Sequence, residues 1–212
     1  MVVESIYSMN GDFASLTEIV NICEKYNAAL IVDEAHATGI YGSKGEGIVS
    51  SKGLNEKVLA RVHTFGKAIG ANGATILCSS NLKEFLINYC RPFIFSTALP
   101  IHSLAAIKCG YQFLEEAENR KLHLHFLIDE FKKQFNAENC KLFPSSSQIQ
   151  SIYMRGNAKV KYLAEELQKK GFDVRPILSP TVPIGKERIR ICLHSFNSVQ
   201  EVHTLVRIIN SF

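Results

Sequence analysis

Lys67 is the residue whose surroundings best suit covalent chemistry. It follows the strand-like run 62–65 and lies in the glycine-rich segment Gly66–Gly70. A lysine at the end of a strand, among small residues, can approach a carbonyl compound and condense with it to form an imine. We therefore expect an enzyme, although a surface lysine in a glycine turn would have the same local sequence.

Asp33 and His36 form a second candidate group, directly after the short apolar run 28–32. In open α/β sheets, ligands bind at the carboxyl ends of the strands, so Asp33 has the position of a site residue. A buried carboxylate needs a cationic partner, and a protonated heterocyclic nitrogen would serve. The alternative, equally compatible with the position, is that Asp33 caps a turn or pairs with an arginine. His36 alone is weaker evidence.

Two arginines alternate with apolar residues in the segment 187–193. The alternation predicts a strand whose core face carries Ile189, Ile191 and Leu193. A guanidinium fixed on the other face can bind a carboxylate through two parallel hydrogen bonds, and Arg190 is the candidate. For Arg188 we expect a solvated charge at the edge of the sheet.

The elements that must position these residues suggest an α/β fold. Strands are expected at 2–8, 28–32, 58–64 and 74–79, with helices at 15–26 and 82–89. Strands alternating with helices favour a largely parallel sheet, and Ser15 with Glu18 is spaced like a capping box. The second half predicts a smaller α+β domain, with helices at 100–118, 121–135, 158–170 and 198–210 and strands at 149–154, 173–175 and 189–193. We therefore expect one domain over residues 1–108 and another over 109–212.

Composition narrows the classes of partner. The 212 residues include 24 basic and 20 acidic side chains, and the basic ones are scattered, so no nucleic acid partner is expected. No apolar stretch approaches the length needed to span a membrane. The six cysteines form no CxxC pair, which favours buried free thiols in a reducing cytoplasm over disulfides or a metal site. Because the chain starts within an expected strand, we expect sequence upstream to be missing.

In order and spacing, several segments resemble the pyridoxal-phosphate α-oxoamine synthases of the fold-type I aminotransferase superfamily. The two main motifs are Asp33–Gly39 (Asp-Glu-Ala-His-Ala-Thr-Gly) and Thr64–Ala68 (Thr-Phe-Gly-Lys-Ala). Ser8–Gly11, Phe95–Pro100 and the Arg-Ile-Arg strand match the same family. The resemblance runs along the whole chain and corresponds to the C-terminal part of the family's large domain together with its small domain.

The resemblance implies a role for each matching residue. Lys67 would hold pyridoxal 5'-phosphate through its amine and transfer protons, and Asp33 would pair with the pyridine nitrogen. The other implied contacts are His36 near the ring hydroxyl, Ser8 near the cofactor, Thr64 at the phosphate, Thr97 at the phosphate in the neighbouring subunit, and Arg190 at the amino-acid carboxylate.

The family's reaction joins an amino acid to an acyl-CoA and releases carbon dioxide. The residues 63–68, 96–100 and 181–185 most resemble members that join L-alanine to pimeloyl-CoA in biotin synthesis. Glycine with acetyl-CoA is the nearest competing pair, and a non-catalytic remnant or assembly subunit is the third possibility. The family's N-terminal half, with the ring-stacking residue and much of the acyl-CoA site, is absent. We therefore expect weak cofactor binding and no activity from this chain alone, and a homodimer in full-length relatives.

Overall fold

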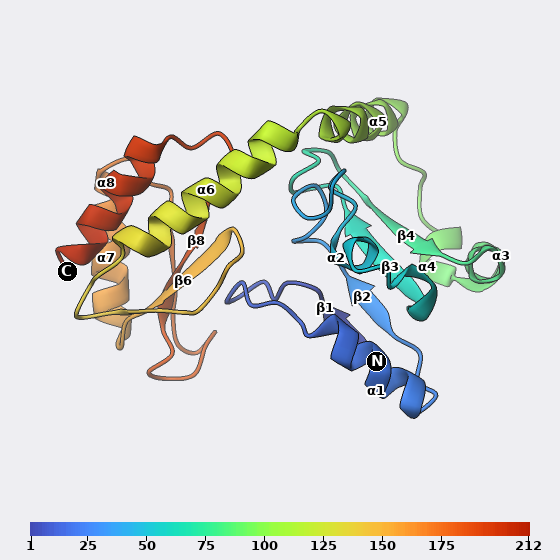
Figure 1. The fold of residues 1–212 in the computed structure, drawn as a ribbon, viewed down its shortest axis with the longest axis horizontal. Helices are drawn as coiled ribbons and strands as arrows, with labels where there is room; N and C mark the ends of the chain where they lie inside the picture. Colours follow the sequence, from blue (N-terminus) through green and yellow to red (C-terminus); the bar gives the residue numbers. More distant parts are fainter. The chain divides into compact units, whose positions relative to one another are not determined.

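The computed structural model describes all residues from Met1 to Phe212 and divides into two units (Figure 1). The first unit comprises Met1–Ile6 and Ala14–Glu118. The second comprises Tyr7–Phe13 and Asn119–Phe212. The chain thus enters the second unit briefly near its start and returns to it after Glu118. The domain boundary expected at residue 108 stays a prediction.

The first unit is built on a sheet with the strand order β1-β2-β3-β4. Its strands are β1 (Val2–Glu4), β2 (Ile31–Asp33), β3 (Ala60–Thr64) and β4 (Ala74–Cys78). The first three are parallel and β4 is antiparallel to β3, which confirms the expected α/β fold with a mostly parallel sheet.

The strand β2 begins at Ile31, later than the sequence suggested, because the turn that follows the preceding helix takes up residues 27–29. Helix α1 (Leu16–Lys25) is closed by the left-handed residue Asn27 and by a hydrogen bond from the Ala28 amide to the Cys23 carbonyl. Residues 27–29 therefore belong to the connection. The capping box expected at Ser15 is also wrong, since the Ser15 backbone has ψ 64° and its side chain makes no capping bond.

The register of the sheet decides which side chains share a face. Asp33 pairs with Val62 on β3, and His63 pairs with Thr75 on β4. Because successive side chains of a strand point to opposite faces, Asp33 and Thr64 share one face, whereas His63 lies on the other.

The remaining helices of the first unit differ in how many of their residues are buried. They are α2 (Ile48–Ser51), the 3₁₀ turn η1 (Asn55–Lys57), α3 (Ser80–Tyr89), α4 (Arg91–Ile94) and α5 (Ile101–Glu115). Neither α3 nor α4 has a buried residue. Phe85, Tyr89, Phe93 and Phe95 are all exposed, so this part of the first unit carries a large apolar surface.

The second unit is a four-stranded antiparallel sheet with the order β5-β6-β8-β7. Its strands are β5 (Lys141–Leu142), β6 (Ile149–Tyr153), β7 (Arg175–Ile177) and β8 (Arg188–Cys192), and its helices are α6 (Glu118–Gln134), α7 (Asn157–Lys169) and α8 (Val199–Asn210). Fully buried Phe131, Leu163 and Ile189 lie in its core. The strand expected at 173–175 begins at Arg175 instead. The Val174 carbonyl accepts a hydrogen bond of 2.7 Å from the side-chain amide of Gln168, so Val174 belongs to the connection before the strand.

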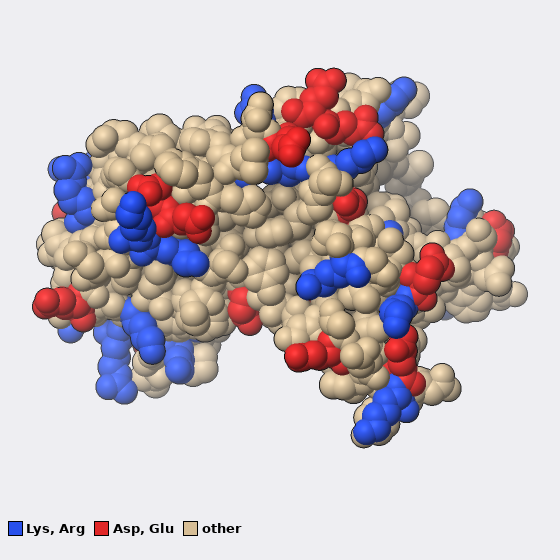
Figure 2. Space-filling view, in the orientation of Figure 1, with Lys and Arg blue, Asp and Glu red and all other residues tan.

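The surface bears charges of both signs, and Figure 2 shows them interspersed on the face in view. None of the helices has the length and hydropathy needed to cross a lipid bilayer. The six cysteines are all free, but only Cys23 and Cys140 are buried, so the expectation of buried thiols holds for these two alone.

Candidate functional site

Asp33 ends β2 and lies half-buried at the carboxyl edge of the sheet. Its Oδ1 accepts a hydrogen bond of 2.7 Å from the Ala35 amide, so the carboxylate does cap a turn. Only one of its two oxygens is used in this way. The turn therefore fixes the orientation of the side chain and leaves an acceptor for a cationic group of a ligand.

Thr64 ends β3 on the same face of the sheet as Asp33. Its Oγ1 is buried and has no hydrogen-bond partner within the chain. A buried hydroxyl left unpaired costs about 1–3 kcal/mol, so native proteins rarely leave one without a partner. This hydroxyl is suited to donate to an anionic oxygen of a bound molecule.

Lys67 lies in the tight turn that joins β3 to β4. The turn is held by hydrogen bonds between the Phe65 amide and the Gly73 carbonyl, at 2.9 Å, and between the Ala71 amide and the Phe65 carbonyl, at 2.8 Å. Gly70 and Gly73 have φ values of +68° and +111°, which glycine adopts without strain. The glycines thus shape the turn, and Lys67 itself is exposed on it.

His36 lies in the turn that follows Asp33 and is half-buried. The Glu34 carbonyl accepts hydrogen bonds from the amides of Ala37 and Thr38 and from the Thr38 hydroxyl, at 2.8–2.9 Å. These bonds set the backbone that carries His36. Thr97, by contrast, is exposed in the connection between α4 and α5.

Glu34 connects the elements of this region, although no feature of its sequence position marks it as important. Its side chain is fully buried, and Oε1 accepts hydrogen bonds from the amides of Ile48, at 2.6 Å, and Val49, at 3.0 Å. Its Oε2 lies 3.5 Å from Nε2 of the buried His63. A Cβ on Gly47 would lie 2.5 Å from Oε2, so glycine is needed there. No spacing signal separates this structural glutamate from the neighbouring Asp33.

In the second unit, Arg190 and Ser8 are brought together. Arg190 is half-buried on β8, and its Nε donates a hydrogen bond of 2.6 Å to the Ser8 carbonyl. This bond fixes the plane of the guanidinium by one edge. The terminal nitrogens are then available for the two parallel hydrogen bonds that bind a carboxylate.

Arg188 is buried, so the expectation of a solvated charge at the sheet edge is wrong. The physical reason is topological, because β8 lies between β6 and β7 rather than at the edge. The guanidinium donates to Asn10 Oδ1 and, at 2.9 Å, to the Tyr153 hydroxyl. Its Nε donates to the Lys186 carbonyl at 3.0 Å, and its carbon lies 4.4 Å from the centroid of the Tyr153 ring. Arg188 thereby anchors the segment Tyr7–Phe13 within the second unit.

We expect Arg188→Met to destabilise the second unit by about 2–3 kcal/mol, because charge-assisted hydrogen bonds are lost and their acceptors stay buried. Urea unfolding with the exposed Arg207→Met as the control would measure the difference. Equal midpoints for the two variants would contradict the anchoring role.

Comparisons with known proteins agree on one family. The sequence model of the family described as aminotransferase class I and II matches residues 1–209 of the chain. The 8-amino-7-oxononanoate synthase of Emericella nidulans is 40% identical over 216 residues, which cover 97% of this chain and 52% of that protein. The protein of the same name from Methylobacillus flagellatus is 33% identical and is matched over 99% of this chain and 53% of its own length. The chain thus spans about half the length of these curated relatives.

Solved structures show the same fold. A serine palmitoyltransferase from S. paucimobilis, with a bound PLP–myriocin aldimine, superposes with a TM-score of 0.91 at 25% identity and is matched over 53% of its chain. An 8-amino-7-oxononanoate synthase from Francisella tularensis has a TM-score of 0.87 at 28% identity and is matched over 61% of its chain. Each similarity covers 99% of this chain.

Proposed function

Because this chain belongs to the aminotransferase class I and II family, we propose that it carries the lysine side of a pyridoxal-phosphate acyltransferase site. The proposed reaction joins L-alanine to pimeloyl-CoA and releases carbon dioxide, which is the reaction of 8-amino-7-oxononanoate synthase in biotin synthesis. The relatives of that name support the choice of substrates.

One observation carries the cofactor assignment. The buried Thr64 hydroxyl has no partner, it shares a face of the sheet with Asp33, and Lys67 follows three residues later. A phosphate acceptor, a cationic ring nitrogen and an aldehyde are the three groups that these side chains would bind. Pyridoxal phosphate contains all three, so the residues present fit this cofactor.

The chain's own residues then have distinct tasks. Pyridoxal phosphate, when bound, supplies an electron sink for a carbanion at the substrate's α-carbon. Lys67 holds the cofactor through its amine and moves the α-carbon proton. Asp33 keeps the ring nitrogen protonated, because a nearby carboxylate favours the cationic form. Thr64 donates to the phosphate.

Four further residues complete the proposed set. Arg190 binds the amino-acid carboxylate through its terminal nitrogens and so orients the bonds to the α-carbon. His36 lies near the ring hydroxyl, and Ser8 approaches the cofactor. The proposal includes a cytoplasmic homodimer in which Thr97 contacts the phosphate bound by the partner subunit.

The substrates are tested by the release of CoA. We expect no release of CoA above background from the purified chain. A fusion that supplies the preceding half of the Emericella nidulans relative should release CoA. The fusion should prefer L-alanine with pimeloyl-CoA over glycine with acetyl-CoA, and Lys67→Ala in the fusion is the matched control.

Each other outcome has a definite meaning. Turnover by the chain alone would contradict the expected dependence on the other half. A preference for glycine and acetyl-CoA would contradict the proposed substrates. A folded fusion that is inactive with both pairs would favour the non-catalytic alternative.

A further inference from the structure

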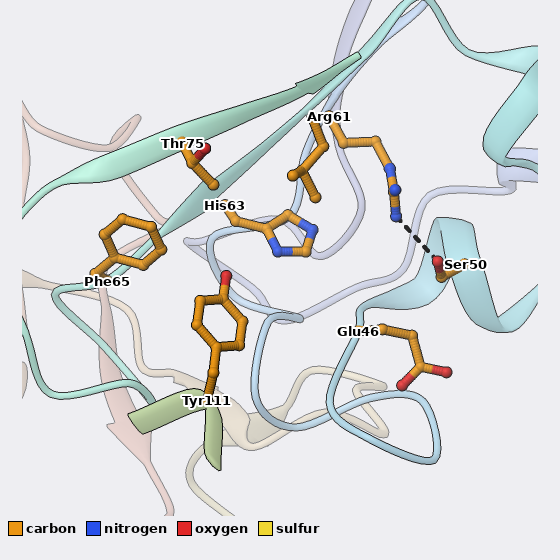
Figure 3. Close-up of a pocket in the computed structure, with 8 residues that line it drawn as sticks. Glu46, Ser50, Arg61, His63, Phe65, Thr75 and Tyr111 are labelled. Carbon is orange, nitrogen blue, oxygen red and sulfur yellow. Dashed lines mark hydrogen bonds between the residues drawn. The ribbon is translucent and has the colours of Figure 1, made fainter. Parts of the chain in front are cut away.

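A pocket of about 420 Å³ opens in the first unit, on the face of the sheet opposite Asp33 and Thr64 (Figure 3). Its floor consists of Arg61 and His63 from β3, together with Thr75 and Leu77 from the adjacent strand β4. The volume is in the range of small-molecule sites. The roles proposed above leave this pocket unassigned.

Arg61 brings a positive charge to the pocket without a negative partner. Its Nη1 donates a hydrogen bond of 3.0 Å to the Ser50 hydroxyl, which fixes the guanidinium, and Arg61 takes part in none of the ion pairs of the chain. Glu46 also lines the pocket, but Figure 3 shows its carboxylate turned toward the loop, where it accepts a hydrogen bond of 2.7 Å from the Lys44 amide. A half-buried arginine that lacks an acidic neighbour is suited to an anionic ligand.

His63 is 3% exposed and projects from β3 into the region between Arg61 and Tyr111 (Figure 3). Neither of its ring nitrogens has a hydrogen-bond partner within the chain. Its Nε2 lies 3.5 Å from Oε2 of the buried Glu34, at ion-pair distance, whereas Nδ1 has no such neighbour. The Nδ1 atom of this imidazole is therefore a buried polar atom beside the pocket that has no partner within the chain.

The other walls are apolar or carry a hydroxyl. Phe65 and Leu77 supply apolar surface, and the Phe65 ring meets the Tyr111 ring edge-on, with centroids 6.1 Å apart. Burial raises the pKa of the Tyr111 phenol, so the hydroxyl keeps its proton and can donate. Figure 3 shows that hydroxyl directed toward His63.

We propose that this pocket binds a small monocarboxylic acid with an apolar body. The carboxylate contacts Arg61, and the body packs against Phe65, Leu77 and Tyr111. A cation, hydroxyl donors and apolar walls in one cavity match both parts of such a molecule. This site is independent of the proposed function, because it uses neither Lys67 nor the face of the sheet that carries Asp33.

Hexanoate is the probe, and the ring signals of His63 in a histidine-selective NMR spectrum are the readout. The signals are assigned with His63→Gln. We expect a saturable shift with hexanoate at concentrations below micelle formation. Hexanamide, which has the same shape without the charge, should bind about tenfold more weakly or worse, because hydrogen bonds to charged groups are the stronger kind. Inorganic phosphate, which lacks the apolar body, should also be weaker.

Variants locate the site. Arg61→Met should weaken hexanoate about tenfold or more, whereas Arg207→Met, in the second unit, should leave the affinity unchanged. The proposal is overturned if hexanoate gives no saturable shift, if hexanamide or phosphate binds as tightly, or if a folded Arg61→Met chain keeps full affinity. The comparison of the three probes on the unaltered chain decides the matter even if Arg61→Met fails to fold.

Discussion

Borohydride reduction of the chain in the presence of pyridoxal phosphate should place a stable label on Lys67, and Lys67→Ala should remove most of the total label. Reduction converts a reversible lysine imine into a stable amine, so it records binding that is weak. Selectivity for Lys67 is expected because Asp33 and Thr64 would favour the ring nitrogen and the phosphate at the neighbouring strand ends. Peptide mapping by mass spectrometry identifies the labelled lysine.

Variants of these two residues test the cause of the selectivity. Asp33→Asn should lower the label on Lys67 about tenfold, since the loss of one favourable charge interaction commonly changes a pKa by about one unit. Thr64→Val keeps the shape and removes the hydroxyl, and should lower the label less. Lys83→Ala, an exposed change on α3, is the control. Equal labelling of many lysines, with little change in Lys67→Ala, would remove the basis of the proposed function.

Glu34→Ala should destabilise the first unit by about 3 kcal/mol or more. The change leaves the amides of Ile48 and Val49 without their acceptor and leaves the buried His63 without its nearest acidic partner. Domains are commonly stable by only 5–15 kcal/mol, so this is a large fraction of the total. Glu34→Gln retains an acceptor oxygen and should cost less.

Hydrogen exchange can localise the effect of Glu34→Ala. Amides of β2 and β3 should exchange faster, while those of β6 and β8 in the second unit serve as an internal reference. Glu84→Ala, at an exposed position on α3, is the matched control. If Glu34→Ala and Glu84→Ala unfold at the same urea concentration, the bridging role assigned to Glu34 is incorrect.

The sequence predicted the regular elements well where local chemistry determines them. Ser198 at the start of α8 makes the full capping box with Glu201, and Gly171 follows α7 with φ +89°, as a helix-terminating glycine should. Ser15 and Glu18 have the same spacing, yet the Ser15 backbone does not take the extended conformation that directs a capping hydroxyl. Spacing alone therefore does not establish a cap.

Burial of polar groups was the part that the sequence could not reveal. Arg188 and Arg190 are two residues apart on one strand, and only the order β6-β8-β7 shows that Arg188 is buried against Tyr153. Glu34 is adjacent to Asp33 in a motif that resembles a catalytic one, but its partners lie 14 and 15 residues away. Both cases depend on long-range contacts, which a local pattern does not encode.

The apolar surface of α3 and α4 has a consequence for handling the protein. Phe85 and Tyr89 stack on each other at the surface, with ring centroids 5.0 Å apart, and Phe93 and Phe95 follow nearby in the chain. Exposed aromatic surface of this kind is bound by molecular chaperones and promotes aggregation in concentrated solution. Cofactor binding and turnover should therefore be measured in dilute samples, or in the presence of a polypeptide that covers these helices.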